Sequence, residues 1–446
     1  QQMLRKAAED GVETAMHRAA NMKACPIGAD SACCKHCAMG PCRLSSKDPY
    51  GKTGVCGASI DVIASRNFAR MVATGTAAHT DHGMTMLDVF RGVVNGEIKD
   101  YQIKDEQKLL DVAEGLGIET EGREVKEIAT DLYHELERTY TQVEGEIPFA
   151  NRVPPKTLEK WRELGIVPRG AMREIMEIMH RTHMGVDQDH ENMVKQCSRT
   201  ALADGWGGSM VATEISDILF GTPSPVLAGV DMGYLDEKQV NIIVNGHEPN
   251  LFESIIASVN DPKLLEEAKA AGAEGINILG MCCSGAEVLG RHGVPHAGNF
   301  MSTEAVLITG AVDCMAVDVQ CIMPALAPLS ECYGTKFFTT NPRAKMEGAA
   351  HIEFHEHKPR QCTDKIVKEA IKRFKNRKVK IVIPQNKSLG IHGFSHEYIN
   401  YMLGGTFRAS YVPLNDNIIN GRIRGVAGVV GCTNPRVRQD YVHVEL

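Results

Sequence analysis

Residues 240–247 have the sequence VNIIVNGH, a short apolar run that ends at Gly246 and is followed at once by a histidine. A β-branched run of this length, bounded by a glycine turn, is typical of a strand buried inside a parallel sheet. Four similar runs follow along the chain, at 275–279, 314–319, 379–384 and 425–430. Because these runs lead into stretches with helical spacing, the sequence predicts parallel α/β sheets in two successive domains, with a boundary near 343–358.

Upstream of these runs the spacing of apolar residues is helical. Residues 1–24 have this spacing, and it returns from about residue 60 to residue 217. A loop rich in cysteine lies between the two stretches. We therefore expect a mostly helical N-terminal part, in which Met172, Met176 and Met179 form a stripe of the core.

The composition is that of a globular protein, with 43% hydrophobic and 24% charged residues in a chain of 446. The net charge of −7 argues against a nucleic-acid partner. No apolar run reaches the roughly 20 residues that span a bilayer, and no charged-then-apolar leader opens the chain. The sequence predicts a cytoplasmic protein without a membrane span.

The chain has 14 cysteines, and six of them fall within residues 25–56. Disulfide frameworks are typical of small secreted domains, so this pattern favours metal or cluster ligation in a reducing compartment. Cys34, Cys37, Cys42 and Cys56 supply four thiolates, which suit either zinc or a [4Fe–4S] cluster. The Cys-x2-Cys-x4-Cys spacing is closer to ferredoxin ligation and favours iron–sulfur.

Two cysteines of the loop, Cys25 and Cys33, are left over. They are either reduced cysteines packed as small hydrophobic residues or ligands of a cluster shared between subunits. The second alternative follows because a second copy of the chain, related by a two-fold axis, would add two more thiols.

Residues with special chemistry follow the predicted strands. They are His247, Cys283 with its neighbour Cys282, Cys321 and Cys432. A single cysteine after a strand is more often buried and inert. The ligand crevice of an open α/β sheet lies beyond the carboxyl ends of its strands, however, so we expect these side chains to converge on one site.

Two histidines, His79 and His82, lie three positions apart and share a face if the segment is helical. Such a pair can relay protons or bind a metal. The alternative is that both are ordinary packed or surface histidines.

Seven motifs in order along the chain resemble those of the catalytic subunit of the anaerobic nickel–iron carbon monoxide dehydrogenases. They are CPIGADSACCKHCAMGPC, GVCGAS, AAHTDHG, VNGHEP, GMCCSGAEVLGRHG, DVQCIMPAL and GCTNPRVRQD. The joint order of the motifs carries the resemblance more than any one of them.

The resemblance implies a multidomain α/β fold assembled as a homodimer. A helical domain with the Fe–S cysteine loop at 25–56 would cover residues 1–222. Two Rossmann-like parallel α/β domains would follow, at 223–345 and 346–446, the second one incomplete.

The resemblance also implies the cofactors and their ligands. Cys34, Cys37, Cys42 and Cys56 match the ligands of a [4Fe–4S] relay cluster. Cys25 and Cys33 match the pair that shares an intersubunit Fe–S cluster, of the [4Fe–4S] type. For the active-site Ni–Fe–S cluster, the matching ligands are His247 and Cys283 at the unique iron, and Cys321 and Cys432 at the cubane irons.

Three further residues match groups near the substrate. His79 matches a histidine beside the substrate, His82 the next member of a proton path, and Asp204 an acid near the bound carboxylate. Thr85 and Asp88 stand where further histidines would extend the path, so proton exit is expected to differ here.

The activity implied is the reversible oxidation of CO with water to CO2, two protons and two electrons. A metal-bound water would be deprotonated near neutral pH, and the electrons would leave through the relay clusters. The resemblance implies a ferredoxin-like electron acceptor and allows an acetyl-CoA synthase as a further partner. In the family, two further cysteines, one of them the nickel ligand, and a catalytic lysine come from sequence beyond Leu446, so we expect a truncated copy of a longer enzyme.

Two other functions compete with this one. The chain could be a hybrid-cluster-type hydroxylamine reductase, against which Cys25, Cys33 and VNGHEP argue. It could also be a non-catalytic Fe–S electron-transfer or scaffold subunit, which the strand-end histidine and cysteines oppose.

Overall fold

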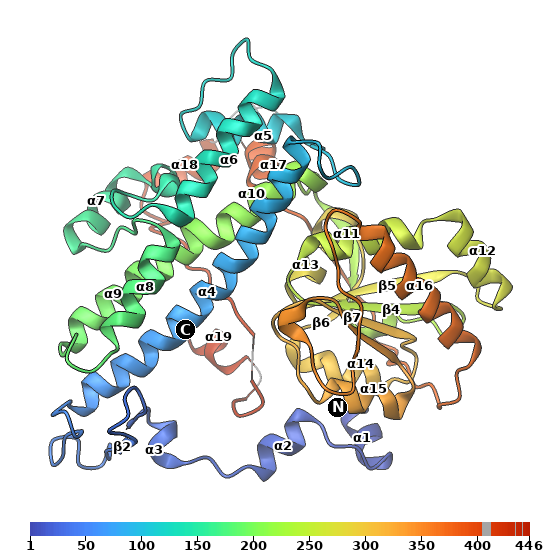
Figure 1. Cartoon of the computed structure of the whole chain (residues 1–446), viewed down its shortest axis with the longest axis horizontal. Coiled ribbons are helices and arrows are strands. Elements are labelled where there is room, and N and C mark those ends of the chain that lie inside the picture. Colours follow the sequence, from blue (N-terminus) through green and yellow to red (C-terminus); the bar gives the residue numbers. More distant parts are fainter. Residues whose placement is uncertain (404–411, 433, 439) are drawn as a thin grey trace. The chain divides into compact units, whose positions relative to one another are not determined.

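The structure is a computed structural model that describes residues 1–403, 412–432, 434–438 and 440–446. The chain forms two compact units (Figure 1). Lys23–Gly221 makes a helical unit, and Gln1–Met22 joins Thr222–Leu446 in an α/β unit.

The long helix α4 (Ile60–Val94) organises the helical unit. It begins where the Ser59 hydroxyl oxygen accepts the Val62 N–H, a typical N-cap. Figure 1 shows α8, α9 and α10 running beside it. The other elements are α3 (Pro26–Ala29), β1 (Cys33–Cys34), β2 (Cys42–Arg43), α5 (Glu106–Gly115), α6 (Val125–Thr141), η1 (Pro148–Arg152), α7 (Pro155–Leu164), α8 (Ala171–Arg181), α9 (His190–Ala203), the π-helical turn η2 (Asp204–Gly208) and α10 (Ser209–Phe220).

The helical prediction for residues 60–217 is confirmed, but the methionine stripe is wrong. Met172, Met176 and Met179 are 44%, 62% and 39% exposed. Helix α8 turns a different face inward, with Glu174 fully buried against Arg169 and Gln196. A polar network therefore decides which face of this amphipathic helix is buried.

The α/β unit is built on one eight-stranded sheet in the order β10-β3-β6-β5-β4-β7-β8-β9. Every neighbouring pair is parallel except β10 with β3. The strands are β3 (Val226–Val230), β4 (Val240–Asn245), β5 (Ile276–Met281), β6 (His296–Gly298), β7 (Cys314–Val317), β8 (Lys336–Thr339), β9 (Ala350–His351) and β10 (Ser388–His392).

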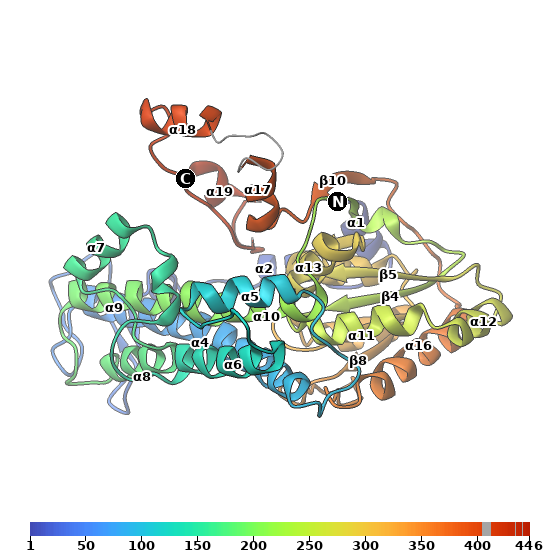
Figure 2. The same ribbon diagram turned by 90° about the horizontal axis from the view of Figure 1, so that it is seen from above.

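Helices cover both faces of this sheet: Figure 1 shows α11 and α16 on one side and α14 and α15 on the other, and Figure 2 shows α11 and α16 from above. One core packs the sheet against α11 (Pro249–Val259), α12 (Pro262–Ala270), α13 (Cys282–His292) and α16 (Pro359–Lys375). The opposite core packs it against α1 (Gln2–Glu9), α14 (Thr303–Ile308) and α15 (Leu326–Tyr333). The shorter elements are α2 (Ala15–Asn21), η3 (Met232–Tyr234), η4 (Phe300–Ser302), η5 (Pro342–Ala344), α17 (His396–Leu403), α18 (Val412–Ile419) and α19 (Tyr441–Glu445).

Three of the five predicted strands form: the runs at 240–245, 275–279 and 314–319 correspond to β4, β5 and β7. The prediction at 379–384 is wrong. There the side chains of Ile381, Val382 and Ile383 pack on the core, but only Val382 N–H bonds a neighbouring segment, at the Thr309 carbonyl. The strand predicted at 425–430 is also wrong, because these residues pair with no strand in the described chain.

The predicted division into domains 1–222, 223–345 and 346–446 stays a prediction. Residues 1–22 belong to the α/β unit, where Met3 and Ala7 of α1 enter the core. Strands β9 and β10 lie beyond residue 345 and still pair with strands that precede it.

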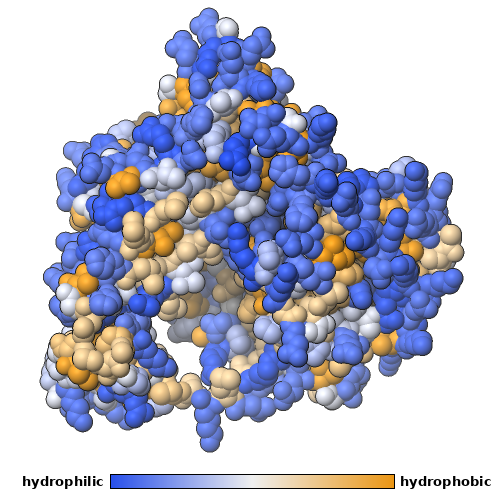
Figure 3. Space-filling view, in the orientation of Figure 1, coloured by the Kyte–Doolittle hydropathy of each residue, from blue (hydrophilic) through white to orange (hydrophobic). Residues whose placement is uncertain are grey.

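Hydrophilic residues cover most of the face that Figure 3 shows. None of the described helices is both long enough and apolar enough to cross a membrane.

An ion pair between Arg377 and Asp313 holds the amino ends of the central strands. The Arg377 Nε donates to Asp313 Oδ1 at 2.7 Å, and the guanidinium also donates to the carbonyls of Glu237 and Gln239. Asp313 Oδ2 accepts the N–H of Asn241 in β4 at 2.8 Å. The Asp313 side chain is 1% exposed, so its charge depends on this partner.

We predict that Arg377→Met lowers the free energy of unfolding by about 3–5 kcal/mol, because it leaves a buried carboxylate unpaired. Urea denaturation followed by circular dichroism measures the change. The control is Lys372→Met, which breaks an exposed pair with Glu369 and is expected to cost less than about 1 kcal/mol. Equal losses in the two variants would contradict the role given to the buried pair.

Candidate functional site

Four cysteines of the helical unit line one small pocket. Cys34 in β1 and Cys42 in β2 are directly opposite each other in the antiparallel pair. Cys37 lies in the loop that connects the two strands, and Cys56 lies in the turn before α4. The structure therefore brings together the four thiols that the spacing singled out.

Backbone groups approach these sulfurs closely. The Val55 N–H donates to Cys42 Sγ at 3.4 Å. A Cβ at Gly54 would lie 3.6 Å from the same sulfur, and a Cβ at Gly40 would lie 3.0 Å from the Cys34 carbonyl oxygen. Hydrogen bonds to the ligating sulfurs are a feature of iron–sulfur sites and help to set their reduction potentials.

Cys56 has the most clearly perturbed thiol of the loop. Its pKa is lowered by a hydrogen bond from the Ala58 backbone N–H and then, against the effect of burial, by the guanidinium of Arg66. Arg66 borders the same pocket. The surroundings of Cys56 thus stabilise a thiolate.

Neither Cys25 nor Cys33 is among the described residues that border this pocket. Cys25 precedes α3 and is exposed, and Cys33 is half-buried. Since successive side chains of a strand point to opposite faces, Cys33 points away from the pocket that Cys34 lines. The shared cluster stays a prediction.

His79 in α4 contacts Asp204, the first residue of η2. Its Nδ1 lies 2.8 Å from Asp204 Oδ1, and the Ser209 hydroxyl donates to the same oxygen at 3.2 Å. A Cβ at Gly208 would lie 2.9 Å from the Thr80 backbone nitrogen. The absence of a side chain at Gly208 lets the π-helical turn approach α4, and such turns are frequent at functional sites.

His82 lies one turn further along the same helix and is half-buried. The next turns carry other groups. Thr85 donates to the Asp81 carbonyl at 3.2 Å, and Asp88 is paired with Arg91. His82 is therefore the last histidine along α4.

In the α/β unit, three predicted site residues follow neighbouring strands and converge. His247 follows β4, Cys283 lies in the first turn of α13 directly after β5, and Cys321 follows β7. Cys321 Sγ lies 3.7 Å from His247 Nε2. Burial raises the pKa of the Cys432 thiol, and the charges of the nearby Cys321 and Cys283 raise it further.

The electrostatics of His247 follow from this grouping. Burial alone lowers its pKa, but the hydrogen bonds and charge of Cys283 and Cys321 outweigh burial and raise the pKa to about 10. Its Nδ1 lies 3.1 Å from the Val319 carbonyl oxygen and donates to it, so Nε2 faces the sulfurs. Imidazole and thiols thus form one group of donors.

A buried carboxylate that the sequence analysis missed holds this group together. Asp318 accepts the backbone N–H of His247 at 2.8 Å and that of Glu248 at 3.0 Å. A Cβ at Gly246 would lie 1.6 Å from Asp318 Oδ1, so only glycine fits there. The signal for Asp318 was an acid inside an apolar run, CMAVDV.

Three residues of the site have positive φ, which non-glycine residues rarely adopt: Cys282 at 58°, Gln320 at 62° and Cys321 at 53°. Cys282 was expected among the side chains that converge here, although the resemblance assigned it no ligand role. Its thiol has a raised pKa, first because of a hydrogen bond with Cys321 and then because of burial. Strained backbone of this kind clusters at functional sites.

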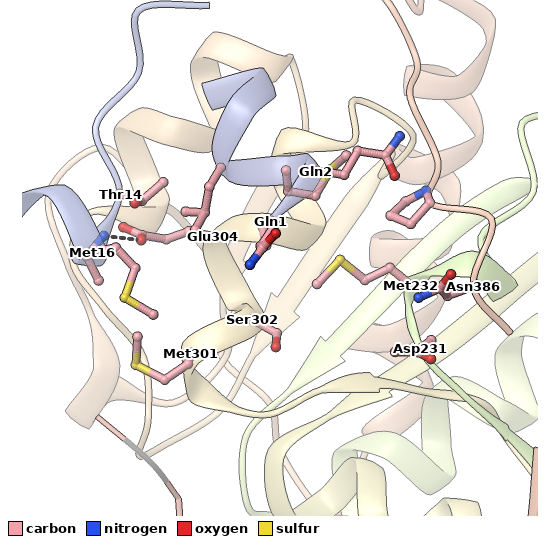
Figure 4. Close-up of a pocket in the computed structure, with 15 residues that line it drawn as sticks. Gln1, Gln2, Thr14, Met16, Asp231, Met232, Met301, Ser302, Glu304 and Asn386 are labelled. Atoms are coloured by element: carbon pink, nitrogen blue, oxygen red, sulfur yellow. Dashed lines mark hydrogen bonds between the residues drawn. The ribbon is translucent and has the colours of Figure 1, made fainter. Parts of the chain in front are cut away.

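A separate pocket of about 460 Å³ in the α/β unit was not predicted (Figure 4). Figure 4 shows Glu304 pointing toward α2, where it accepts the Ala15 N–H at 2.5 Å. Arg18 donates to the other carboxylate oxygen at 2.5 Å. This carboxylate is therefore occupied in holding α2.

The side chains of the four-cysteine pocket and the strand-end side chains around His247 both have donor atoms that suit metal clusters. Thiolates select iron–sulfur centres, and imidazole suits iron and nickel. Among the described residues, no three side chains are already arranged around one metal ion. The fit therefore rests on the donor types, on the pocket shared by four thiols and on the contact of His247 with the sulfurs.

Comparisons with known proteins agree with these observations. Residues 32–446 match the model of the Prismane/CO dehydrogenase family. Carbon monoxide dehydrogenase 1 of Methanosarcina mazei is 46% identical over 451 residues, which cover 100% of this chain and 71% of the relative. Carbon monoxide dehydrogenase of Rhodospirillum rubrum is 41% identical, over 100% of this chain and 70% of the relative. A Ni-free crystal structure of the enzyme from Thermococcus sp. AM4 has a TM-score of 0.93 at 44% identity, covering 99% of this chain and 70% of that chain.

We predict that Cys42→Ser removes most of the iron held at the four-cysteine pocket, because a hydroxyl is a poor ligand for iron in a sulfur cluster. Iron and sulfide analysis after anaerobic reconstitution should show a loss of about four irons per chain, the content of one cubane. Cys332→Ser, at an exposed cysteine outside both groups, is the control and should leave the iron content unchanged.

Proposed function

The chain belongs to the Prismane/CO dehydrogenase family, and from this membership we propose that it oxidises CO with water to CO2, two protons and two electrons, reversibly. It is an oxidoreductase that uses a Ni–Fe–S cluster and [4Fe–4S] clusters. The observation that carries the proposal is the convergence of His247, Cys283 and Cys321 at the carboxyl ends of neighbouring strands.

His247, Cys283, Cys321 and Cys432 would hold the active-site cluster. When bound, that cluster supplies a site for CO and a water whose pKa is low enough to give hydroxide near neutral pH. The protein orients its donors through Asp318, which holds the backbone on both sides of His247.

His79 and Asp204 would handle the protons. His79 Nδ1 is bonded to Asp204, and we propose that this imidazole holds a proton or donates a hydrogen bond to substrate oxygen. Asp204 and Ser209 set the direction of that imidazole. His82 would take the proton one turn further along the helix.

Electrons would leave through the cluster of Cys34, Cys37, Cys42 and Cys56. Cys25 and Cys33 would share a further Fe–S cluster with a second copy of the chain, which makes the protein a homodimer. We propose a ferredoxin-like protein as the electron acceptor, a cytoplasmic location, and an acetyl-CoA synthase as a further partner.

Neither rival function is favoured. The relatives reported above are named carbon monoxide dehydrogenase, at 41–46% identity over the whole of this chain. A scaffold subunit would not need the imidazole of His247 among its thiols.

The test is CO-dependent reduction of a viologen dye by the anaerobically reconstituted full-length protein, with nickel and iron analysis of the same sample. We expect dye reduction with CO and none with hydroxylamine as the substrate. Hydroxylamine turnover without CO oxidation would favour the hydroxylamine reductase. A sample that binds iron but neither nickel nor CO would favour the scaffold.

We predict that Asp204→Asn lowers kcat for CO oxidation by about 10- to 100-fold, because a neutral amide supports the protonated imidazole of His79 poorly. The KM for CO and the metal content should change little, since Asp204 is placed beside His79 and not among the proposed ligands. Asp111→Asn, which removes an exposed carboxylate from α5 of the same unit, is the control. An equal loss of kcat in both variants would contradict the assignment.

A further inference from the structure

Arg66 is a buried cation that pairs with no carboxylate in the described chain. Its side chain is 1% exposed. One guanidinium nitrogen, Nη2, donates to the backbone carbonyl of Asp187 at 3.2 Å, and Nε has no hydrogen-bond partner. The Asp187 carboxylate instead bonds Arg181 and Asn192. A buried charge without a counter-charge is strongly destabilising, so an anion is needed nearby.

The four-cysteine pocket is the place where that anion fits. Arg66 borders the pocket beside Cys34, Cys37, Cys42 and Cys56. No Asp or Glu is found among the described residues that border the pocket. The four cysteine sulfurs, which would be thiolates when they ligate a cluster, therefore supply the negative charge beside this guanidinium.

The other basic residue that borders the pocket, His36, does not supply a permanent positive charge there. His36 also borders it, and its Nε2 lies 2.9 Å from Asn67 Oδ1. Burial lowers the pKa of His36, which favours the neutral imidazole. Arg66 thus supplies the permanent positive charge at this pocket, at least among the described residues.

We propose that Arg66 is the counter-charge of the iron–sulfur cluster held by the four cysteines and that it raises the reduction potential of that cluster. The inference rests on the cluster assignment made under the proposed function. Reduction adds one electron to an already negative centre, so a fixed cation beside it stabilises the reduced form more than the oxidised form. Charge and hydrogen bonds around the sulfurs are known determinants of such potentials.

The test is an EPR-monitored redox titration of the reconstituted full chain. The signal of this cluster is the one that Cys42→Ser removes. In Arg66→Gln we expect the midpoint potential to become more negative, by at least a tenfold change in the one-electron reduction equilibrium, ~59 mV. Arg66→Lys keeps the charge and should shift the potential by less than half as much.

Arg70→Gln is the matched control. Arg70 lies one turn further along α4, carries the same charge and does not border the pocket; its Nε donates to the Thr182 hydroxyl at 3.1 Å. Removing its charge should shift the potential less than removing that of Arg66.

Each result decides the question. An Arg66→Gln potential equal to that of the unsubstituted chain overturns the inference. If Arg66→Gln fails to hold iron while Arg66→Lys retains it, the charge is required and the inference stands; if both lose iron, Arg66 acts by packing and the inference is overturned. A chain in which Cys42→Ser changes neither the iron content nor any EPR signal would instead overturn the cluster assignment itself.

Discussion

The parallel pairing of β4 with β5 on one side and β7 on the other is the constraint on which the strand-end site depends. In the register of the sheet, Asn245 is opposite both Met281 and Val317, so the three strands end together. Their next residues are then forced to the same edge. The imidazole of His247 meets a sulfur that is distant in the sequence because this register places the residues after the three strands at one edge.

Buried charge organises both units. Around the sheet, Arg377 meets Asp313 at the amino ends of the strands, and backbone N–H groups meet Asp318 at the carboxyl ends. In the helical unit, Glu174 is fully buried and is satisfied by Arg169 and Gln196. Unpaired charges in an interior of low polarity are costly, so these contacts position the chain as firmly as apolar packing does. Arg66 differs from these buried charges because no carboxylate of the described chain pairs with it. Its proposed partner is the cluster of the four-cysteine pocket.

Elements whose structure depends on local periodicity were predicted well, and elements that depend on a distant partner were not. The run at 240–245 forms a strand because strands on both sides pair with it. The run at 379–384 is similarly rich in Val and Ile but packs its side chains without a hydrogen-bond ladder. The spacing of Met176 and its neighbours predicted a helix correctly, but it predicted the wrong buried face. That face is selected by the buried ion pair of Glu174 with Arg169, which lies outside the helix.

The amino-acid order by itself determined the donor types, the cysteine spacing and the alternation of strand and helix, since these depend on side-chain chemistry and on contacts within a few residues. It also carried the motifs that identify the family. Only the tertiary structure placed Cys42 opposite Cys34, set His79 against Asp204 and put the carboxylate of Asp318 beneath His247. The physical reason is that each of these contacts joins segments whose separation in space is set by strand register and helix packing, which no local pattern encodes.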